Sequence, residues 1–96
     1  MLHTVSHSPY QIDMSALVNT IGQGDVLVLL QDGVTAALKD SRWLVRLVQR
    51  NPINIYVLRE DVDARGLLLL IDSRVEIIDY SGLVDLSVDH YPQVNW

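Results

Sequence analysis

The fold is decided by residues 26–37, which read Val26-Leu27-Val28-Leu29-Leu30-Gln31-Asp32-Gly33-Val34-Thr35-Ala36-Ala37. An apolar run of strand length ends there at a polar Gln-Asp-Gly turn, and small helix-forming residues follow. A run without polar alternation is typical of a strand that is buried on both faces, as in a parallel sheet covered by helices. Because the loops after such strands usually carry function, we expect Gln31, Asp32 and Gly33 to lie at the functional edge of the sheet.

Strand-like segments occur at four places along the chain. Residues 25–30 contain the run above, and residues 53–58 are rich in β-branched and aromatic side chains. Shorter apolar segments at residues 2–5 and 75–78 are predicted as further strands. Helical patterns separate the segments, which predicts an α/β fold: a mainly parallel sheet of four to five strands with helices on both faces. With 96 residues and no linker or repeat, a single domain over residues 1–96 is expected.

Capping residues and apolar spacing predict the first helices. Asp13 is a candidate N-cap of a helix whose inward face is formed by Met14, Leu17, Val18 and Ile21. Gly22 and Gly24 are expected to end this helix. A short helix is predicted over residues 34–38. Ser41 is the candidate cap of the next helix, in which the inward side chains are Leu44, Leu47 and Val48.

The second half of the chain also contains residues that typically begin or end helices. Asn51-Pro52 is a stop signal for the preceding helix. Residues 60–66 predict a helical turn that is closed by a glycine. A last helix is predicted after Asp79 or Ser81, and Tyr91-Pro92 begins a non-helical tail.

Two apolar features have more than one interpretation. Residues 67–71, Leu-Leu-Leu-Leu-Ile, are compatible with a helix end, a short strand or an interface loop, and with a core, a partner-facing or an unprotected exposed position. Trp96 is expected to dock against this domain or against a partner, because so large an aromatic side chain is costly to leave in water.

The acidic composition argues against direct binding of nucleic acid. The formal net charge is −5, and the seven Lys and Arg residues are scattered along the chain. Binding of nucleic-acid phosphates requires Lys and Arg side chains that are clustered. Arg42, Arg46 and Arg50 come nearest to a cluster, and their helical spacing is interpreted as one solvated face. The apolar runs are too short to span a membrane and the start does not resemble an export signal, so a cytoplasmic protein is expected.

Few residues of the chain are candidates for catalysis or for metal binding. The chain has no cysteine, which excludes disulfides, thiolate metal sites and a cysteine nucleophile. Asp32 is interpreted as a turn residue, because a receiver domain also needs an acidic pair after the first strand and a suitably placed lysine; Lys39 lies in the wrong segment. His3 and His7 lie roughly 13 Å apart in extended chain, too far to share a metal. No catalytic residue, metal or cofactor is therefore expected.

Small-molecule or nucleotide binding through the loops after the first two strands stays an alternative. Thr4, Ser6 and Ser8 loosely resemble the hydroxyl-rich phosphate loop of flavodoxins, although that loop here lacks glycines. The pair Gly22 and Gly24 precedes a strand instead of following one, so it is not a dinucleotide-binding turn.

An ordered set of motifs along the whole chain resembles the TusB/DsrH family, the smallest branch of the DsrE/DsrF/DsrH fold. No single motif is specific, but the order of the set and the length of the chain both match. The motifs are Met1-Leu2-His3-Thr4-Val5 with Ser8-Pro9, residues 29–37, Ile55-Tyr56-Val57-Leu58, Glu60-Asp61, Ala64-Arg65-Gly66, Ile77-Ile78-Asp79-Tyr80 and Trp96.

The resemblance implies one subunit of a TusB–TusC–TusD heterohexamer, a dimer of trimers. Such a complex receives persulfide sulfur from TusA and passes it, with TusE, toward 2-thiolation of the tRNA wobble uridine. The family carries the sulfur on a cysteine of the TusD-type subunit, and some DsrH members have one in the first helix, where residues 14–19 of this chain have none. Because sulfur relay requires a thiolate, the resemblance implies a non-catalytic subunit and not an enzyme.

A TusC-like and a TusD-like subunit are therefore the expected partners, with no direct contact to nucleic acid. Gly33 is expected to need either a positive φ or a close approach of backbone. The candidate partner interface consists of Gln31, Asp32, Gly33, Val34, Leu68, Leu69 and Trp96.

Overall fold

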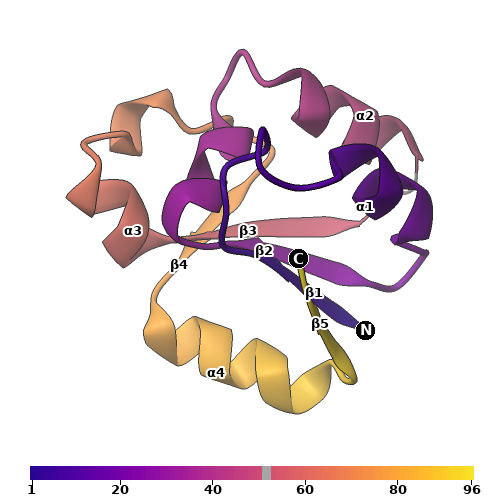
Figure 1. Cartoon of the computed structure of the whole chain (residues 1–96). Coiled ribbons are helices and arrows are strands. Elements are labelled where there is room, and N and C mark those ends of the chain that lie inside the picture. The colour runs from indigo at the N-terminus through magenta and orange to yellow at the C-terminus, as the bar shows by residue number, and fades with distance from the viewer. Residues whose placement is uncertain (51–52) are drawn as a thin grey trace.

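A computed structural model describes residues 1–50 and 53–96 and confirms the α/β fold (Figure 1). The predicted stop at Asn51-Pro52 lies outside the described residues. In chain order the elements are β1 (Leu2–Val5), α1 (Met14–Thr20), β2 (Val26–Leu29), the 3₁₀ helix η1 (Gln31–Ala37), α2 (Arg42–Arg50), β3 (Asn54–Leu58), α3 (Arg59–Ala64), the 3₁₀ helix η2 (Leu68–Leu70), β4 (Glu76–Ile78), α4 (Tyr80–Asp89) and β5 (Gln93–Asn95).

The sheet has five strands in the order β4-β3-β2-β1-β5, and every neighbouring pair is parallel. Leu2 of β1 is in register with Val26 of β2, and Val26 with Asn54 of β3. The fifth strand lies within the predicted tail, on the far side of β1. The tail is non-helical, as expected, but its three residues form an edge strand that the sequence pattern does not show.

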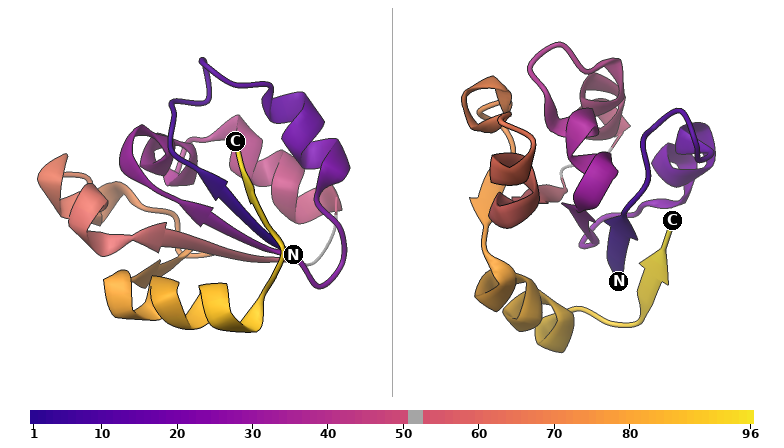
Figure 2. Two further views of the ribbon diagram at one scale, coloured as in Figure 1. Left: turned by 60° about the horizontal axis from the view of Figure 1, so that its bottom comes forward. Right: turned by 60° about the vertical axis from the view of Figure 1, so that its left-hand side comes forward.

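The two faces of the sheet are covered unequally, although both carry helices as predicted. Figures 1 and 2 show α1, α2 and α3 on one face, with α4 on the other. Side chains of a strand alternate between faces, so Leu27 and Leu29 point into the larger core, whereas Val26 and Val28 point toward α4. The larger core also takes its apolar side chains from α1, η1, α2 and α3.

Three predicted N-caps are confirmed by side-chain hydrogen bonds. Asp13 Oδ1 accepts from the N–H of Ala16 at 2.9 Å, and Ser41 Oγ accepts from the N–H of Leu44 at 3.4 Å. For the last helix the cap is Asp79 rather than Ser81, because its carboxylate accepts from the N–H of Gly82 at 2.9 Å. Each cap satisfies an amide that has no partner inside its own helix.

Two helix predictions need correction. The first helix ends at Thr20, with extended backbone at Ile21, so Gly22 and Gly24 lie in the turn beyond the helix and do not end it. The helix predicted over residues 34–38 begins earlier, at Gln31, and has 3₁₀ geometry. It ends at Ala37 because Leu38 is extended and forms an isolated antiparallel bridge with Ile71.

The leucine run 67–71 resolves into two parts with different environments. Ile71 is buried and pairs with Leu38, so it belongs to the core. Leu68, Leu69 and Leu70 form η2 and are exposed by 37%, 85% and 51%, respectively. The run is therefore an exposed 3₁₀ turn that is anchored at its end.

Candidate functional site

The turn after β2 folds back onto the end of β1. The N–H of Leu30 donates to the carbonyl oxygen of Val5 at 2.8 Å. Gly33 lies against this same oxygen, and a Cβ added to Gly33 would sit only 2.2 Å from it. Of the two reasons expected for a glycine, close approach of backbone is the correct one. The positive φ belongs to Gln31 instead, at 47°.

Helix α3 holds this turn from the side. Asp61 Oδ2 accepts the backbone N–H of Gln31 at 2.7 Å, and Arg65 donates from Nη2 and Nε to Asp32 Oδ1 at 2.9 and 3.3 Å. The Arg65 guanidinium also donates to the carbonyl oxygen of Asp61 at 3.1 Å. Asp61 therefore stabilises the strained conformation of Gln31.

Sequence reasoning did not assign Asp61 and Arg65 to this site. Asp61 lies 30 residues after Gln31, and Arg65 lies 33 residues after Asp32. A signal was present, because α3 directly follows β3, whose carboxyl end lies at the same sheet edge as that of β2.

The predicted interface residues separate into exposed and buried groups. Gln31 and Asp32 are exposed on the turn, and Leu68 and Leu69 are exposed on η2, beyond α3. Gly33 and Val34 are buried beneath the turn, and Trp96 is half-buried against the larger core.

Trp96 belongs to a buried polar network that joins the end of β5 to β1 and to the start of β2. Its indole N–H donates to Nδ1 of His3 at 3.1 Å, and the two rings stack with centroids 6.2 Å apart. Because Nδ1 accepts, Nε2 of the neutral imidazole carries the proton and donates to Asp25 Oδ2 at 2.9 Å. His3 is fully buried in β1, so it is a structural histidine, and Trp96 docks on its own domain.

Asp25 gathers three donors at the start of β2. Burial tends to raise the pKa of its carboxyl, but the N–H of Gly22, the His3 imidazole and the N-terminal ammonium together lower it below 3.8. The ammonium lies 3.2 Å from Asp25 Oδ1, and the side chain is 18% exposed. The carboxylate is therefore ionised at neutral pH and holds β1 to β2 at their amino ends.

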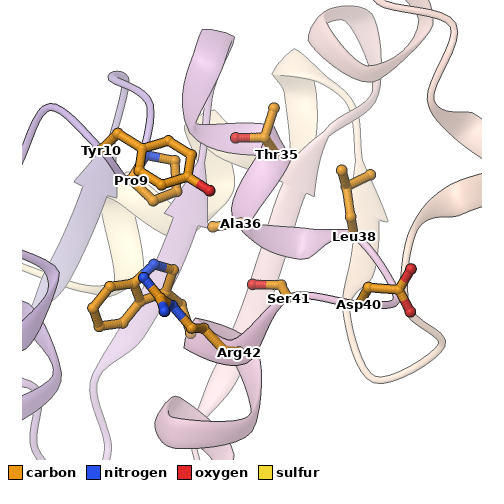
Figure 3. Close-up of a pocket in the computed structure, with 9 residues that line it drawn as sticks. Pro9, Tyr10, Thr35, Ala36, Leu38, Asp40, Ser41 and Arg42 are labelled. Atoms are coloured by element: carbon orange, nitrogen blue, oxygen red, sulfur yellow. The ribbon is translucent and has the colours of Figure 1, made fainter.

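A surface groove lies between the loops that follow β1 and β2 and the start of α2. It has a volume of about 450 Å³ and opens widely to solvent (Figure 3). Tyr10, on its rim, is 90% exposed. The guanidinium carbons of Arg42 and Arg46 lie 5.3 and 4.9 Å from the centroid of the Trp43 ring, a cation–π arrangement that orders this part of α2.

The described residues offer little chemistry beyond these contacts. Residues 1–50 and 53–96 contain no group of three or more His, Cys, Asp or Glu side chains that could hold a metal ion. In the same part of the chain, none of the helices combines the length and apolar character needed to cross a membrane.

A family model described as DsrH-like protein matches residues 7–93. The chain belongs to the DsrH-like family. Among its DsrH-like relatives, Protein TusB of Yersinia pestis (strain Pestoides F) is 48% identical over 96 residues, which cover 100% of both chains. Protein TusB of Enterobacter sp. (strain 638) is 40% identical over 96 residues, again covering 100% of both.

Solved structures share this DsrH-like fold at low sequence identity. The crystal structure of the ychN protein from E. coli aligns with a TM-score of 0.77 and 17% identity, covering 99% of this chain and 97% of that one. The solution NMR structure of protein Tm0979 from Thermotoga maritima aligns with a TM-score of 0.68 and 23% identity, covering 94% of each chain. At these identities the likeness concerns the fold alone.

Proposed function

We propose that the chain is a non-catalytic subunit of a TusBCD-type sulfur-relay complex that supports persulfide transfer for 2-thiolation of the tRNA wobble uridine. The observation that carries this proposal is the end-to-end similarity to proteins named TusB, at 48% and 40% identity. Membership of the DsrH-like family supports the same conclusion.

The composition supports a non-catalytic role within such a relay. Persulfide moves when a thiolate attacks the outer sulfur of a donor persulfide, so each covalent carrier needs a thiol. This chain has no cysteine, and the thioethers of its two methionines cannot replace one. A TusD-like partner would supply the thiol, with TusA upstream and TusE downstream. The net charge of −5 agrees with a subunit that does not contact the tRNA itself.

The structure offers two exposed features for contact with TusC-like or TusD-like subunits. The first is the pair Gln31 and Asp32, which α3 holds in one conformation before any partner binds. The second is the exposed leucine turn at Leu68 and Leu69. A pre-ordered turn costs little entropy on association, which favours its use as a recognition element. Gly33 and Val34 would act from beneath the turn by holding it in place, and Trp96 by fixing β5 on β1.

Co-expression tests the proposal directly. The chain is co-expressed with its TusC-like and TusD-like partners, one of which carries an affinity tag. Size exclusion of the purified material should then give a single species that contains all three polypeptides. In cells that lack this chain, 2-thiouridine measured by mass spectrometry should fall and should return on complementation. If the two partners assemble without this chain and thiolation is unchanged in its absence, the proposal is wrong.

The groove at Tyr10 favours one alternative, a module that binds a small molecule or nucleotide. It lies between the loops after β1 and β2, where such ligands bind in α/β folds. A thermal-shift screen with nucleotides and flavins tests this alternative, and the absence of any shift at millimolar ligand would contradict it.

A further inference from the structure

Helix α4 carries an apolar stripe that the rest of the described chain leaves in solvent. Tyr80, Val84, Val88 and Tyr91 are exposed by 57%, 58%, 68% and 78%, respectively. The spacing of Tyr80, Val84 and Val88 at i, i+4 and i+8 places them along one flank of the helix, over a length of about 12 Å, and Tyr91 follows just beyond the C-cap His90. These four residues are called the α4 flank below. Scattered exposed apolar residues are ordinary, but a continuous stripe marks an interaction surface.

The inward side of α4 is different from this flank. Leu83 and Leu86 pack on the sheet, against the smaller core formed by Leu2, Val26 and Val28. None of the residues of α4 is fully buried, and among the described residues it is the only helix on its face of the sheet (Figure 2). The other face is covered by α1, α2 and α3. The α4 layer is therefore the incomplete one, and a helix from another chain would extend it.

The charge around the flank identifies the kind of partner. Residues 75–96 contain four acidic side chains and no Lys or Arg; the acids are Glu76, Asp79, Asp85 and Asp89. Arg59 lines a hollow beside Asp79 and Gly82 at the start of α4, but its guanidinium is paired with Asp63 at 3.8 Å. A two-fold contact between the α4 helices of two copies would bring these carboxylates together at a cost in free energy. The basic residues Arg42 and Arg46 lie on α2, in the opposite layer, so an α4-to-α2 contact between copies would be head-to-tail and would give rings or filaments.

We propose that the α4 flank is the docking surface for a helix of a different protein, apolar along the contact and bordered by Lys and Arg. This rests on the proposed function, because the helix would belong to a partner subunit of the complex. The flank starts at the same sheet edge as the turn, because the N–H of Tyr80 donates to Glu60, beside the Asp61 that holds Gln31. Val84 and Val88 continue along α4, on the face of the sheet opposite α1 and α2 (Figure 2). A subunit with two such surfaces can join two neighbours.

The test uses a matched pair of valines in the co-expressed complex. Val84→Asp places a charge in the middle of the flank, whereas Val45→Asp places one at a position of α2 that is 41% exposed, in the opposite layer. Roughly tenfold less of the partner subunits should co-purify with the Val84→Asp chain, and unchanged amounts with the Val45→Asp chain. Both isolated variants should show the circular dichroism spectrum of the unchanged chain, since both sites are in solvent.

A second variant tests the charge of the partner. Asp85→Lys leaves the apolar stripe intact but adds a positive charge beside it, so co-purification should fall severalfold, with a weaker effect in high salt. Full co-purification of both Val84→Asp and Asp85→Lys would overturn the inference while leaving the complex, and hence the proposed function, intact. Failure of the unchanged chain to assemble would instead contradict the proposed function. A self-dimer that Val84→Asp alone converts to monomer would also overturn the inference, because the occupant would be a second copy.

Discussion

The indole N–H of Trp96 donates to Nδ1 of the buried His3, 93 residues away in sequence. Together with the backbone bond from the N–H of Trp96 to the carbonyl of Thr4, at 2.8 Å, this contact fixes β5 beside β1. Asn95 adds a third tie, because its side-chain oxygen accepts from the Thr4 hydroxyl at 2.6 Å. The edge strand is short, so its position depends on these side-chain contacts.

Trp96→Phe tests the contact with His3. Phenylalanine keeps an aromatic ring but lacks the five-membered ring that carries the N–H, so Nδ1 of His3 stays buried and loses its donor. The free energy of unfolding should fall by about 1–2 kcal/mol. Urea denaturation followed by circular dichroism measures the change. A variant as stable as the unchanged chain would contradict the role given to this hydrogen bond.

Gly33→Ala tests the close approach under the turn. The new Cβ would lie 2.2 Å from the Val5 carbonyl oxygen, which is backbone and cannot rotate away, so stability should fall by about 1–3 kcal/mol. Gly22→Ala is the matched control, because its nearest atom outside the adjacent residues lies at 3.8 Å. Equal melting temperatures for the two variants would refute the argument.

Gln31→Gly is expected to stabilise the chain. Gln31 has a φ of 47°, which a side chain makes unfavourable, and glycine removes that strain at a smaller cost in chain entropy. The free energy of unfolding should rise by roughly 0.5 kcal/mol. Gln23→Gly, at an exposed residue without positive φ, should instead lower stability slightly. The comparison is made by urea denaturation, and the same sign for both would contradict the prediction.

The lowered pKa of Asp25 predicts a loss of stability in acid. Since the folded carboxyl has a lower pKa than the unfolded one, its contribution to stability is complete above pH of about 5 and is lost as pH falls through the unfolded and then the folded pKa. Asp25→Asn should be less stable at neutral pH and should show a shallower decline between about pH 5 and pH 2. Urea midpoints of both proteins, measured across this pH range, test the prediction. Parallel curves of midpoint against pH would show that Asp25 contributes nothing to the pH dependence of stability.

Asp32→Ala separates recognition from folding at the turn. The carboxylate is 66% exposed, so loss of its ion pair with Arg65 should change stability by no more than about 1 kcal/mol. If the turn contacts a partner subunit, co-purification should nevertheless fall. A variant that assembles and supports tRNA thiolation normally would remove Asp32 from the proposed interface. Gly33→Val cannot make this distinction, because it disturbs the fold itself.

The sequence was sufficient for the central strands, because their apolar runs are local signals. β2 and β3 were both expected within one residue of their observed bounds. β5 could not be expected, since Gln93-Val94-Asn95 has one apolar residue and exists as a strand only through pairing with β1. Periodicity within a segment does not report a partner that lies about 90 residues away.

The site shows the same limit. The polar turn was predicted from its own residues, but its supports Asp61 and Arg65 depend on how α3 packs after β3. The strained residue was also missed, because sequence rules look for positive φ at glycine and here it falls on Gln31. The α4 flank was not assigned because Leu83, Val84 and Leu86 are all apolar, and only the fold shows which of them face the sheet.

The position of β1 between β2 and β5 also bears on how the chain is made. β1 is synthesised well before its second neighbour, which becomes available only when residues 93–95 have been added. Until then one edge of β1 has unpaired amides, and His3 is without its indole donor. Nascent chains are therefore exposed to strand pairing with other chains, and early truncation products should aggregate instead of folding.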